Sequence, residues 1–396
     1  MNSRILFILY VTVFSTIFGL GIIGPIMPIY ADSLGATGVW LGIIFASFSI
    51  SRGILMPIIG KISDERGRRR FILFGLVTYF AISLLYPRAA SVYSLTAVRF
   101  FHGFASAIVI PIAMAYAGEI SMGGKEGQTM GTINQAMFLG MGCGPLLGGA
   151  LYDFFGFSVV FYPLSALAAL AFFLVLFFLP EKKALRKPKG SVSFKGILKN
   201  NLIKGLMIFR IINALGRGGV MSFIPIFASR SGISVLQIGI MVSTPILLMA
   251  LLQIPFGILS DKSNKFFLIM SGSMIGTLSL VLIPLSNGFW QLTALLVIMG
   301  LGAAISMPAA TALAVMAGKD LGLGATMGLF NAAMSIGMIA APLISGLIMD
   351  TLGLNSIFYV AGGISFVGLL FFMYYFKGGI TVFKKGWGRQ EGPAPD

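Results

Sequence analysis

Twelve apolar stretches follow one another along this chain, and each is close to the length of about 20 residues that a transmembrane helix needs. Only 10% of the residues are charged and 57% are hydrophobic, whereas an ordinary soluble domain carries about 25% charged residues. The sequence therefore predicts an all-α membrane protein of twelve transmembrane helices. The expected spans are 5–31, 38–60, 71–87, 91–118, 128–152, 158–179, 203–229, 234–260, 266–285, 289–318, 324–349 and 355–376.

The net charge of +16 is distributed very unevenly over the predicted topology. Only Arg88 and Arg230 fall on one side of the membrane. We expect an integral protein of the plasma membrane. By the positive-inside rule both of its termini and the central loop face the cytoplasm. The charge therefore orients the chain and does not indicate a nucleic-acid partner. The basic residues on the other side are Arg4, Lys61, Arg66, Arg68 to Arg70, Lys125, those from Lys182 to Lys204, Lys262, Lys265, Lys319 and those from Lys377 to Arg389.

One long polar segment, beginning EKKALRKPKG at Glu181, divides the spans six and six. We expect an N-terminal six-helix bundle over 1–180, a cytoplasmic linker over 181–202, a C-terminal bundle over 203–376 and a cytoplasmic tail over 377–396. Shifting the second half by 197 positions aligns GKISD at 60–64 with GILSD at 257–261, and TMGTINQAM at 129–137 with TMGLFNAAM at 326–334. Parallel repeats of this kind are typical of transporters whose halves rock about a central site, although a duplication can also persist for packing alone.

Three motifs resemble those of the major facilitator superfamily, and the resemblance covers the whole chain. They are GKISDERGRRR after the second span, RFFHGFASA in the fourth span, and GMGCGPLLGG in the fifth. The last is similar to the antiporter signature of the twelve-helix drug:proton antiporters. The resemblance implies the major-facilitator fold, with two six-helix halves related by a pseudo-two-fold axis, and it points to exporters.

The fifth-span motif concentrates small residues in an apolar helix. Gly140, Gly144 and Gly148 recur every four residues and share one helical face, where another backbone can approach closely. Pro145 can kink the helix, and Gly149 completes the motif. We expect a bend and a sliding contact, against the eighth span of the other half, that seals one side of the pathway. Tight packing without a sealing role is the alternative.

The loop after the second span predicts a conformational latch at the cytoplasmic end. Asp64 can accept hydrogen bonds from a helix N-terminus or pair with Arg68, and such a contact is released when the halves rock. The superfamily pattern usually has a basic residue directly after the Asp, whereas this sequence has Glu65. The predicted latch comprises Gly60, Asp64, Gly67, Arg68, Arg69 and, in the second half, Asp261.

Charged residues inside a bilayer are costly and point to function. Arg52, Arg99, Arg210 and Arg217 qualify, together with His102, the only histidine in the chain. For Arg52 a packing role is favoured, and Arg99 has the alternative of bonding to carbonyls of the first helix. In the superfamily the first, fourth, seventh and tenth helices line the cavity, which implies a substrate cavity with Arg99, His102, Arg210, Asn213 and Arg217, walled by Phe14 and Phe18.

Carboxylates are missing from the predicted membrane interior. All twelve acidic residues lie in loops or at the ends of spans, whereas an exporter that exchanges cationic drugs for protons is expected to hold one in mid-membrane. A proton site then falls on His102, whose unperturbed pKa is near neutrality, or on a peripheral carboxylate such as Glu119 or Asp32. The arginines make the electrostatic potential of the predicted cavity positive, which favours neutral, amphipathic or anionic solutes over cations.

Two functional hypotheses remain. The first is proton-coupled efflux of small hydrophobic or amphipathic compounds by alternating access, and the second is transport of an anionic metabolite bound by the arginines. A membrane enzyme is not expected, because one histidine and peripheral acids form no triad or metal cluster and the chain has no nucleotide-binding Gly-Lys-Ser/Thr loop. The expected partners are the bilayer, a small-molecule substrate and protons. No cofactor is expected, and we expect the protein to be a monomer.

Overall fold

The computed structural model describes residues 3–120, 126–181, 199–321 and 323–387, and within these ranges the chain is helical and has no β-strand. The first half contains six long helices, α1 (Ser3–Ser33), α2 (Gly38–Arg66), α3 (Arg68–Leu85), α4 (Val92–Ile120), α5 (Glu126–Phe155) and α6 (Tyr162–Phe178). The second half contains α8 (Asn201–Arg230), α9 (Val235–Lys262), α10 (Lys265–Leu282), α11 (Phe289–Leu321), α12 (Leu323–Leu352) and α13 (Leu354–Trp387). Short 3₁₀ turns are η1 (Tyr86–Arg88), η2 (Phe157–Phe161) and η3 (Ile283–Leu285).

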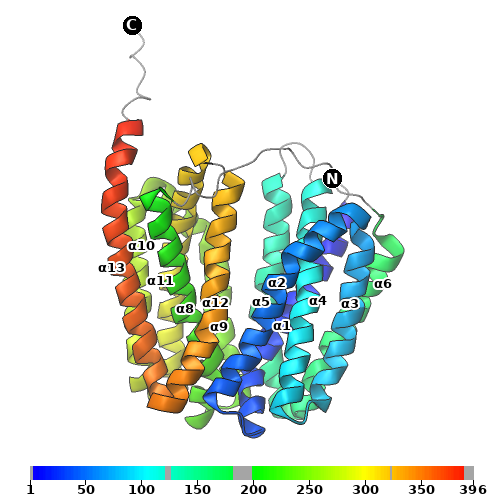
Figure 1. Ribbon diagram of the computed structural model, residues 1–396. Helices are drawn as coiled ribbons and strands as arrows, with labels where there is room; N and C mark the ends of the chain where they lie inside the picture. The colour runs from blue at the N-terminus through cyan, green and yellow to red at the C-terminus, as the bar shows by residue number, and fades with distance from the viewer. Residues whose placement is uncertain (1–2, 121–125, 182–198, 322, 388–396) are drawn as a thin grey trace.

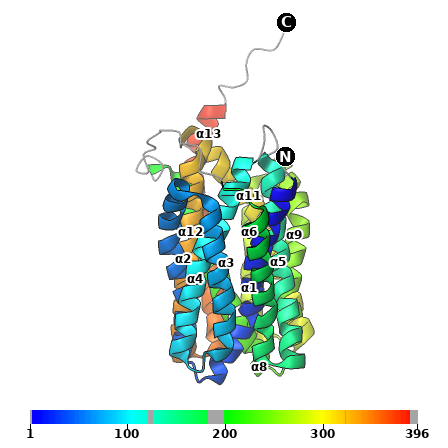
Figure 2. The ribbon, with the colours of Figure 1, turned by 90° about the vertical axis from the view of Figure 1, so that its right-hand side faces the viewer.

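The two halves stand side by side with their helices along one common direction, and α1 begins at the same end of the molecule at which α13 ends (Figures 1 and 2). The predicted all-α architecture of two six-helix halves is confirmed. The last helix differs in one respect, because α13 continues to Trp387, into the segment that the sequence assigned to a tail. The linker beyond Glu181 lies mostly outside the described residues.

The repeat seen in the sequence recurs in the helix boundaries. Helices α3 and α10, α5 and α12, and the turns η1 and η3 begin at positions that differ by the same 197 residues. Turn glycines follow the same spacing, since Gly35 and Gly232 have φ values of 77° and 76°, and Gly156 and Gly353 of 82° and 86°. A positive φ is strained for any residue with a Cβ, so glycine is needed at these helix-to-helix turns.

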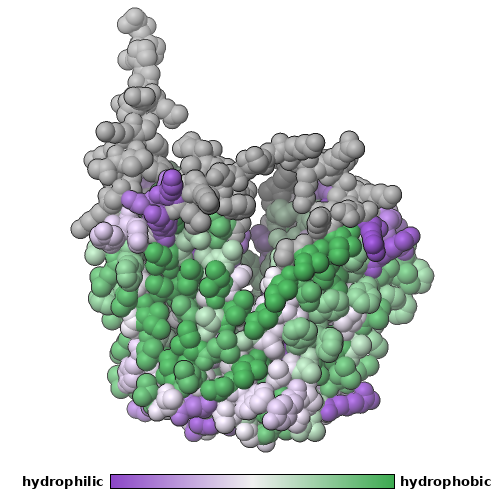
Figure 3. All heavy atoms as spheres, viewed as in Figure 1, coloured by the Kyte–Doolittle hydropathy of each residue, from purple (hydrophilic) through white to green (hydrophobic). Residues whose placement is uncertain are grey.

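On the face seen in Figure 3 a broad apolar band crosses the molecule, and hydrophilic residues lie toward its two ends. Large apolar side chains are exposed in this band, for example Leu251 at 75% and Tyr374 at 73%, as expected of a surface that faces lipid. Eleven of the described helices are long and apolar enough to cross a membrane, and α5 is the twelfth long helix that falls short of that criterion. Its glycines and polar residues lower its mean hydropathy, and small residues suit a helix that packs closely against α1 and α9.

Candidate functional site

A hollow separates the two halves at the end of the molecule where α1 begins and α13 ends (Figures 1 and 3). We call this the open end. At the opposite, closed end the halves contact each other mainly through two helix pairs, α2 with α12 and α5 with α9. These pairs are equivalent under the internal repeat, since α2 corresponds to α9 and α5 to α12. The molecule is thus joined at one end and parted at the other.

Glycines allow the backbones to meet at the closed end. A Cβ atom on Gly42 of α2 would lie 2.6 Å from the carbonyl oxygen of Pro342 in α12, and one on Gly149 of α5 would lie 2.5 Å from that of Val235 in α9. Such contacts are much shorter than real side chains make, so any larger residue would push the helices apart. The close approach of backbones through small residues is the usual way in which membrane helices pack tightly.

Two aspartates join the halves at the same end. The carboxylate of Asp153, near the end of α5, accepts the backbone N–H groups of Val235 at 3.2 Å and Leu236 at 2.8 Å, at the start of α9. Its repeat-mate Asp350, near the end of α12, accepts those of Gly38 at 2.6 Å and Val39 at 2.8 Å, at the start of α2. A carboxylate at a helix N-terminus accepts hydrogen bonds from backbone N–H groups that have no partner within the helix, and it complements the helix dipole. These two contacts form what we call the aspartate clamp.

A third polar contact crosses between the halves at the closed end. The Arg230 guanidinium at the end of α8 lies 2.9 Å from the Asp32 carboxylate at the end of α1, and both side chains are substantially exposed. Exposed ion pairs contribute little, typically less than about 1 kcal/mol. We therefore assign most of the polar stabilisation of the closed end to Asp153 and Asp350. Sequence reasoning missed this role, although the position of the two aspartates at corresponding helix ends, 197 residues apart, was a signal for it.

The fifth-span glycines divide between two partners. Gly140, Gly144 and Gly148 pack against the backbone of α1, inside the N-terminal half. Gly142 and Gly149 instead face α9, the eighth span. The expectation that the first face slides against the eighth span is therefore wrong in this conformation. Both faces are small, and the sequence spacing alone does not say which neighbour each face meets.

The arginines of the predicted latch bind within the N-terminal half. Arg68 at the start of α3 forms an ion pair of 2.8 Å with Glu119 of α4, with side chains only 6% and 15% exposed. The Arg69 guanidinium donates to the carbonyl oxygens of Val175 and Leu176 in α6. Gly67 has a φ of 96° and terminates α2. Gly60 and Asp64 lie in α2, but their surroundings are not described, and Asp261 of α9 is exposed.

We expect Glu119→Gln to lower the free energy of unfolding by about 3 kcal/mol, because it removes the charged partner that lies 2.8 Å from the buried Arg68 guanidinium. Thermal unfolding of the purified protein in detergent measures this effect. Asp261→Asn, at an exposed position in the last turn of α9, is the control and should change stability by less than about 0.5 kcal/mol. Equal stability of the two variants would contradict a stabilising role for the ion pair.

Arg99 and His102 lie inside the N-terminal bundle, among aromatic rings. The guanidinium of Arg99 is 4.7 Å from the ring centre of Phe48 in α2, within the range of cation–π attraction. The Nδ1 atom of His102 is 2.8 Å from the Tyr86 hydroxyl, and its ring packs edge-on to that of Tyr79. Arg99 is 4% exposed and His102 is 1% exposed. The expectation that both side chains line the cavity between the halves is therefore wrong, because they turn toward α2 and α3.

Arg210 is partly exposed and reaches from α8 to α11 and α12. Its guanidinium nitrogens lie 3.1 Å from the sulfur of Met307 and 3.0 Å from that of Met334, and its carbon is 4.8 Å from the ring centre of Phe330. Thioether sulfur is a weak acceptor, so these contacts solvate the cation poorly. Among the described residues no carboxylate pairs with it.

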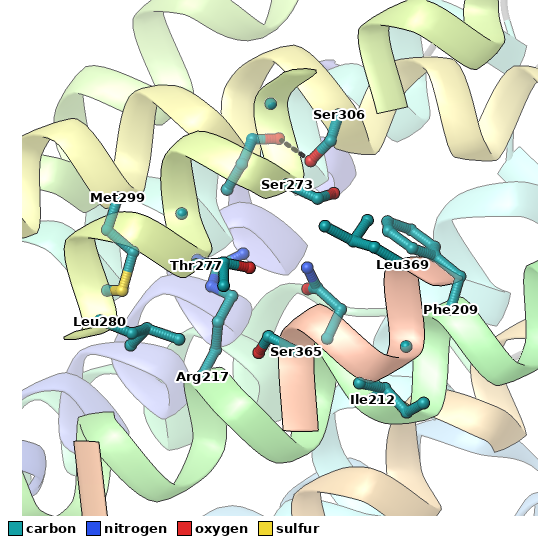
Figure 4. A pocket seen from close by; sticks show the side chains of 15 residues that line it. Phe209, Ile212, Arg217, Ser273, Thr277, Leu280, Met299, Ser306, Ser365 and Leu369 are labelled. Atoms are coloured by element: carbon teal, nitrogen blue, oxygen red, sulfur yellow. Dashed lines mark hydrogen bonds between the residues drawn. The ribbon is translucent and has the colours of Figure 1, made fainter. Parts of the chain in front are cut away.

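Asn213 and Arg217 turn instead into a small cavity within the C-terminal half, between α8, α10, α11 and α13 (Figure 4). The remaining predicted wall residues lie in the first half, where Phe14 stacks on Phe18 with ring centres 5.5 Å apart. Phe14 is partly buried, whereas Phe18 is only 3% exposed. The predicted cavity residues therefore do not form one cluster. Among the described residues no group of three His, Cys, Asp or Glu side chains could hold a metal ion.

Comparison with known proteins agrees with this architecture. The sequence profile of the Major Facilitator Superfamily matches residues 9–210 and 206–394. An uncharacterized MFS-type transporter of Methanocaldococcus jannaschii is 34% identical over 89% of this chain and 93% of its own. The multidrug resistance protein MdtG of Proteus mirabilis is 24% identical over 92% and 94%, and the quinolone resistance protein NorA of Staphylococcus aureus 25% over 93% and 96%.

The fold is shared with a bacterial homologue of the human lysosomal transporter Spinster, solved in an inward-facing and unoccupied conformation. The TM-score is 0.81 at 14% identity, over 96% of this chain and 98% of that one. A variant of the nucleoside transporter NupG gives a TM-score of 0.75 at 16% identity, over 94% and 100%. This chain is an integral membrane protein and belongs to the major facilitator superfamily, whose members are transporters and not enzymes.

Proposed function

We propose that this protein is a secondary transporter that works by alternating access and exports small hydrophobic or amphipathic compounds in exchange for protons. The observation that carries the proposal is the asymmetry of the two ends: the halves touch at the closed end through repeat-equivalent contacts and part at the open end. Contacts that can be broken at one end and formed at the other are what rocking halves require. The similarity to MdtG and NorA supports drug-like substrates.

The distribution of basic residues orients this conformation. The helix ends with the loop arginines lie at the open end, so under the positive-inside rule that end faces the cytoplasm, with both termini. The protein would then be inward-facing in the plasma membrane and closed toward the outside. We propose that it works as a monomer, since one chain supplies both halves and the hollow between them.

We propose that the substrate path runs through the hollow and that Arg210 with Met307 and Met334 forms part of its wall. Methionine is flexible and polarizable and suits binding surfaces that accept many shapes. The same group favours a second candidate function, the transport of organic anions. An anionic oxygen is a much stronger acceptor for a guanidinium than a thioether sulfur is.

Proton coupling is proposed on the similarity to the drug:proton antiporters, with Asp32 and Glu119 as its candidate carriers. Each carboxylate is paired with an arginine, at 2.9 Å in one case and 2.8 Å in the other. Protonation would break such a pair, so either residue can link proton binding to a structural change. His102 is a weaker candidate because it is 1% exposed and packed among aromatic rings.

Proteoliposomes with an imposed pH gradient test the function. We expect neutral and amphipathic dyes to move in the direction opposite to the protons, and a protonophore to abolish this movement. Organic anions should not be transported. Transport of organic anions alone, with a KM that rises about tenfold or more in Arg210→Gln, would replace the first function by the second. Movement of dyes that is indifferent to the protonophore would remove proton coupling.

A further inference from the structure

The cavity in the C-terminal half is lined by residues of that half alone, and several of them are polar groups that lack partners. Residues of four helices line it, and Figure 4 shows the side chains of Arg217, Thr277 and Ser365 converging on it. Arg217 lies in the middle of α8, far from either end of that helix. The cavity volume is about 30 Å³, enough for about two water molecules and too small for a drug-sized solute.

Five polar side chains line this cavity without a hydrogen bond to any other group in the part of the chain that the structure describes. They are those of Asn213, Arg217, Ser273, Thr277 and Ser365. Thr277 is 6% exposed, and the Ser273 hydroxyl oxygen is fully buried without a partner. Buried polar groups in folded proteins nearly always have partners. Thr277 and the Ser273 hydroxyl are buried without a partner, and the partly buried Asn213, Arg217 and Ser365 lie beside them. This cluster of unpartnered polar groups points to a bound species rather than to packing.

The chemistry of the lining selects the sign of that species. Arg217 supplies a permanent positive charge and up to five N–H donors, and the hydroxyls and the amide supply more. No carboxylate lines the cavity. An uncompensated charge at this depth in a bilayer is strongly unfavourable, and a counter-ion relieves it. One cation surrounded by donors thus matches one monovalent anion.

We propose that this cavity binds a small monovalent anion of about the size of chloride, held by Arg217 with Asn213, Ser273, Thr277 and Ser365. The volume excludes organic anions, so the site differs from a substrate site for anionic metabolites. Its bound anion neutralises Arg217 and ties α8 to α10 and α13, within one half of the molecule. The inference does not depend on which solute the protein transports.

The test uses the purified full chain in detergent, with thermal unfolding measured over a series of sodium chloride concentrations. Sodium gluconate keeps the ionic strength constant, because gluconate is too large for the cavity. We expect the unfolding midpoint to rise with chloride and to saturate, since a ligand that binds only the folded state stabilises it. In Arg217→Gln the midpoint should not depend on chloride, whereas Arg52→Gln, which removes an intramembrane arginine from the other half, should keep the full response.

Two further variants decide the matter if Arg217→Gln does not fold. Ser273→Ala and Thr277→Val keep the charge and should each raise the half-saturating chloride concentration about tenfold, because hydrogen bonds to charged groups are strong. Bromide soaked into crystals should give an anomalous peak beside Arg217. A wild-type midpoint indifferent to chloride, or an identical response in Arg217→Gln or in both hydroxyl variants, would overturn the proposal.

Discussion

Replacing both Asp153 and Asp350 by asparagine is expected to shift the protein about a hundredfold away from the conformation described here, toward one in which the closed end opens. Each carboxylate accepts two backbone N–H groups from a helix start in the other half. Bonds to a charged acceptor exceed those to a neutral amide by about 1 kcal/mol, and the helix dipole adds a few tenths. The loss per site is thus close to the 1.4 kcal/mol that corresponds to a tenfold change.

The two sites belong to different helix pairs, so their effects should add. Spin labels at the exposed residues Ser33 and Asn287, one in each half, can report the opening as a longer distance in pulsed electron resonance, after replacement of the single Cys143. Either single variant should give about a tenfold shift. An unchanged distance distribution in the double variant would show that the aspartate clamp does not hold the closed end.

Asp32→Asn is the matched control for the clamp. It also removes a carboxylate that joins the halves at the closed end, but one whose ion pair with Arg230 is exposed. Exposed pairs are screened by water and contribute less than about 1 kcal/mol. We therefore expect a shift below about fivefold. A larger shift for Asp32→Asn than for Asp153→Asn would reverse our assignment of the main stabilising contact.

Gly149→Ala combined with Gly346→Ala is expected to lower the transport rate about thirtyfold or more. A Cβ on Gly149 would lie 2.5 Å from the Val235 carbonyl oxygen, and one on Gly346 would clash with the Gly38 carbonyl oxygen. Overpacking costs about 1–3 kcal/mol per site. The clash exists only when this end is closed, so the substitutions should trap the protein with it open and prevent the cycle from completing.

Initial rates of dye movement into or out of proteoliposomes measure this effect. Gly131→Ala is the matched control, because Gly131 lies in the same helix α5 and a Cβ there meets no atom within 4 Å. Its transport should equal that of the wild type. The thermal midpoints of all variants separate a trapped conformation from a failure to fold. A double variant that folds and transports normally would contradict the need for glycine at this interface.

The sequence predicted only part of the candidate site. The repeat and the loop signature led to the correct family. The sequence singled out the intramembrane arginines, but Arg99 and Arg217 point into the interiors of their own halves, and only Arg210 remains a candidate for the hollow. A helix of known sequence has side chains all around its axis, so its rotation within the bundle decides which of them reach the pathway.

The sequence by itself determined the class, the number of long helices, their repeat and the charged end of the molecule. These follow from properties that each segment carries alone: its hydropathy, its length, its turn glycines and its basic residues. Only the tertiary structure decided which glycine face of α5 meets α9, and that Asp153 and Asp350 bind helix starts in the opposite half. Those contacts join residues far apart in the chain, so they exist only when the packing of the two halves fixes the distances between them.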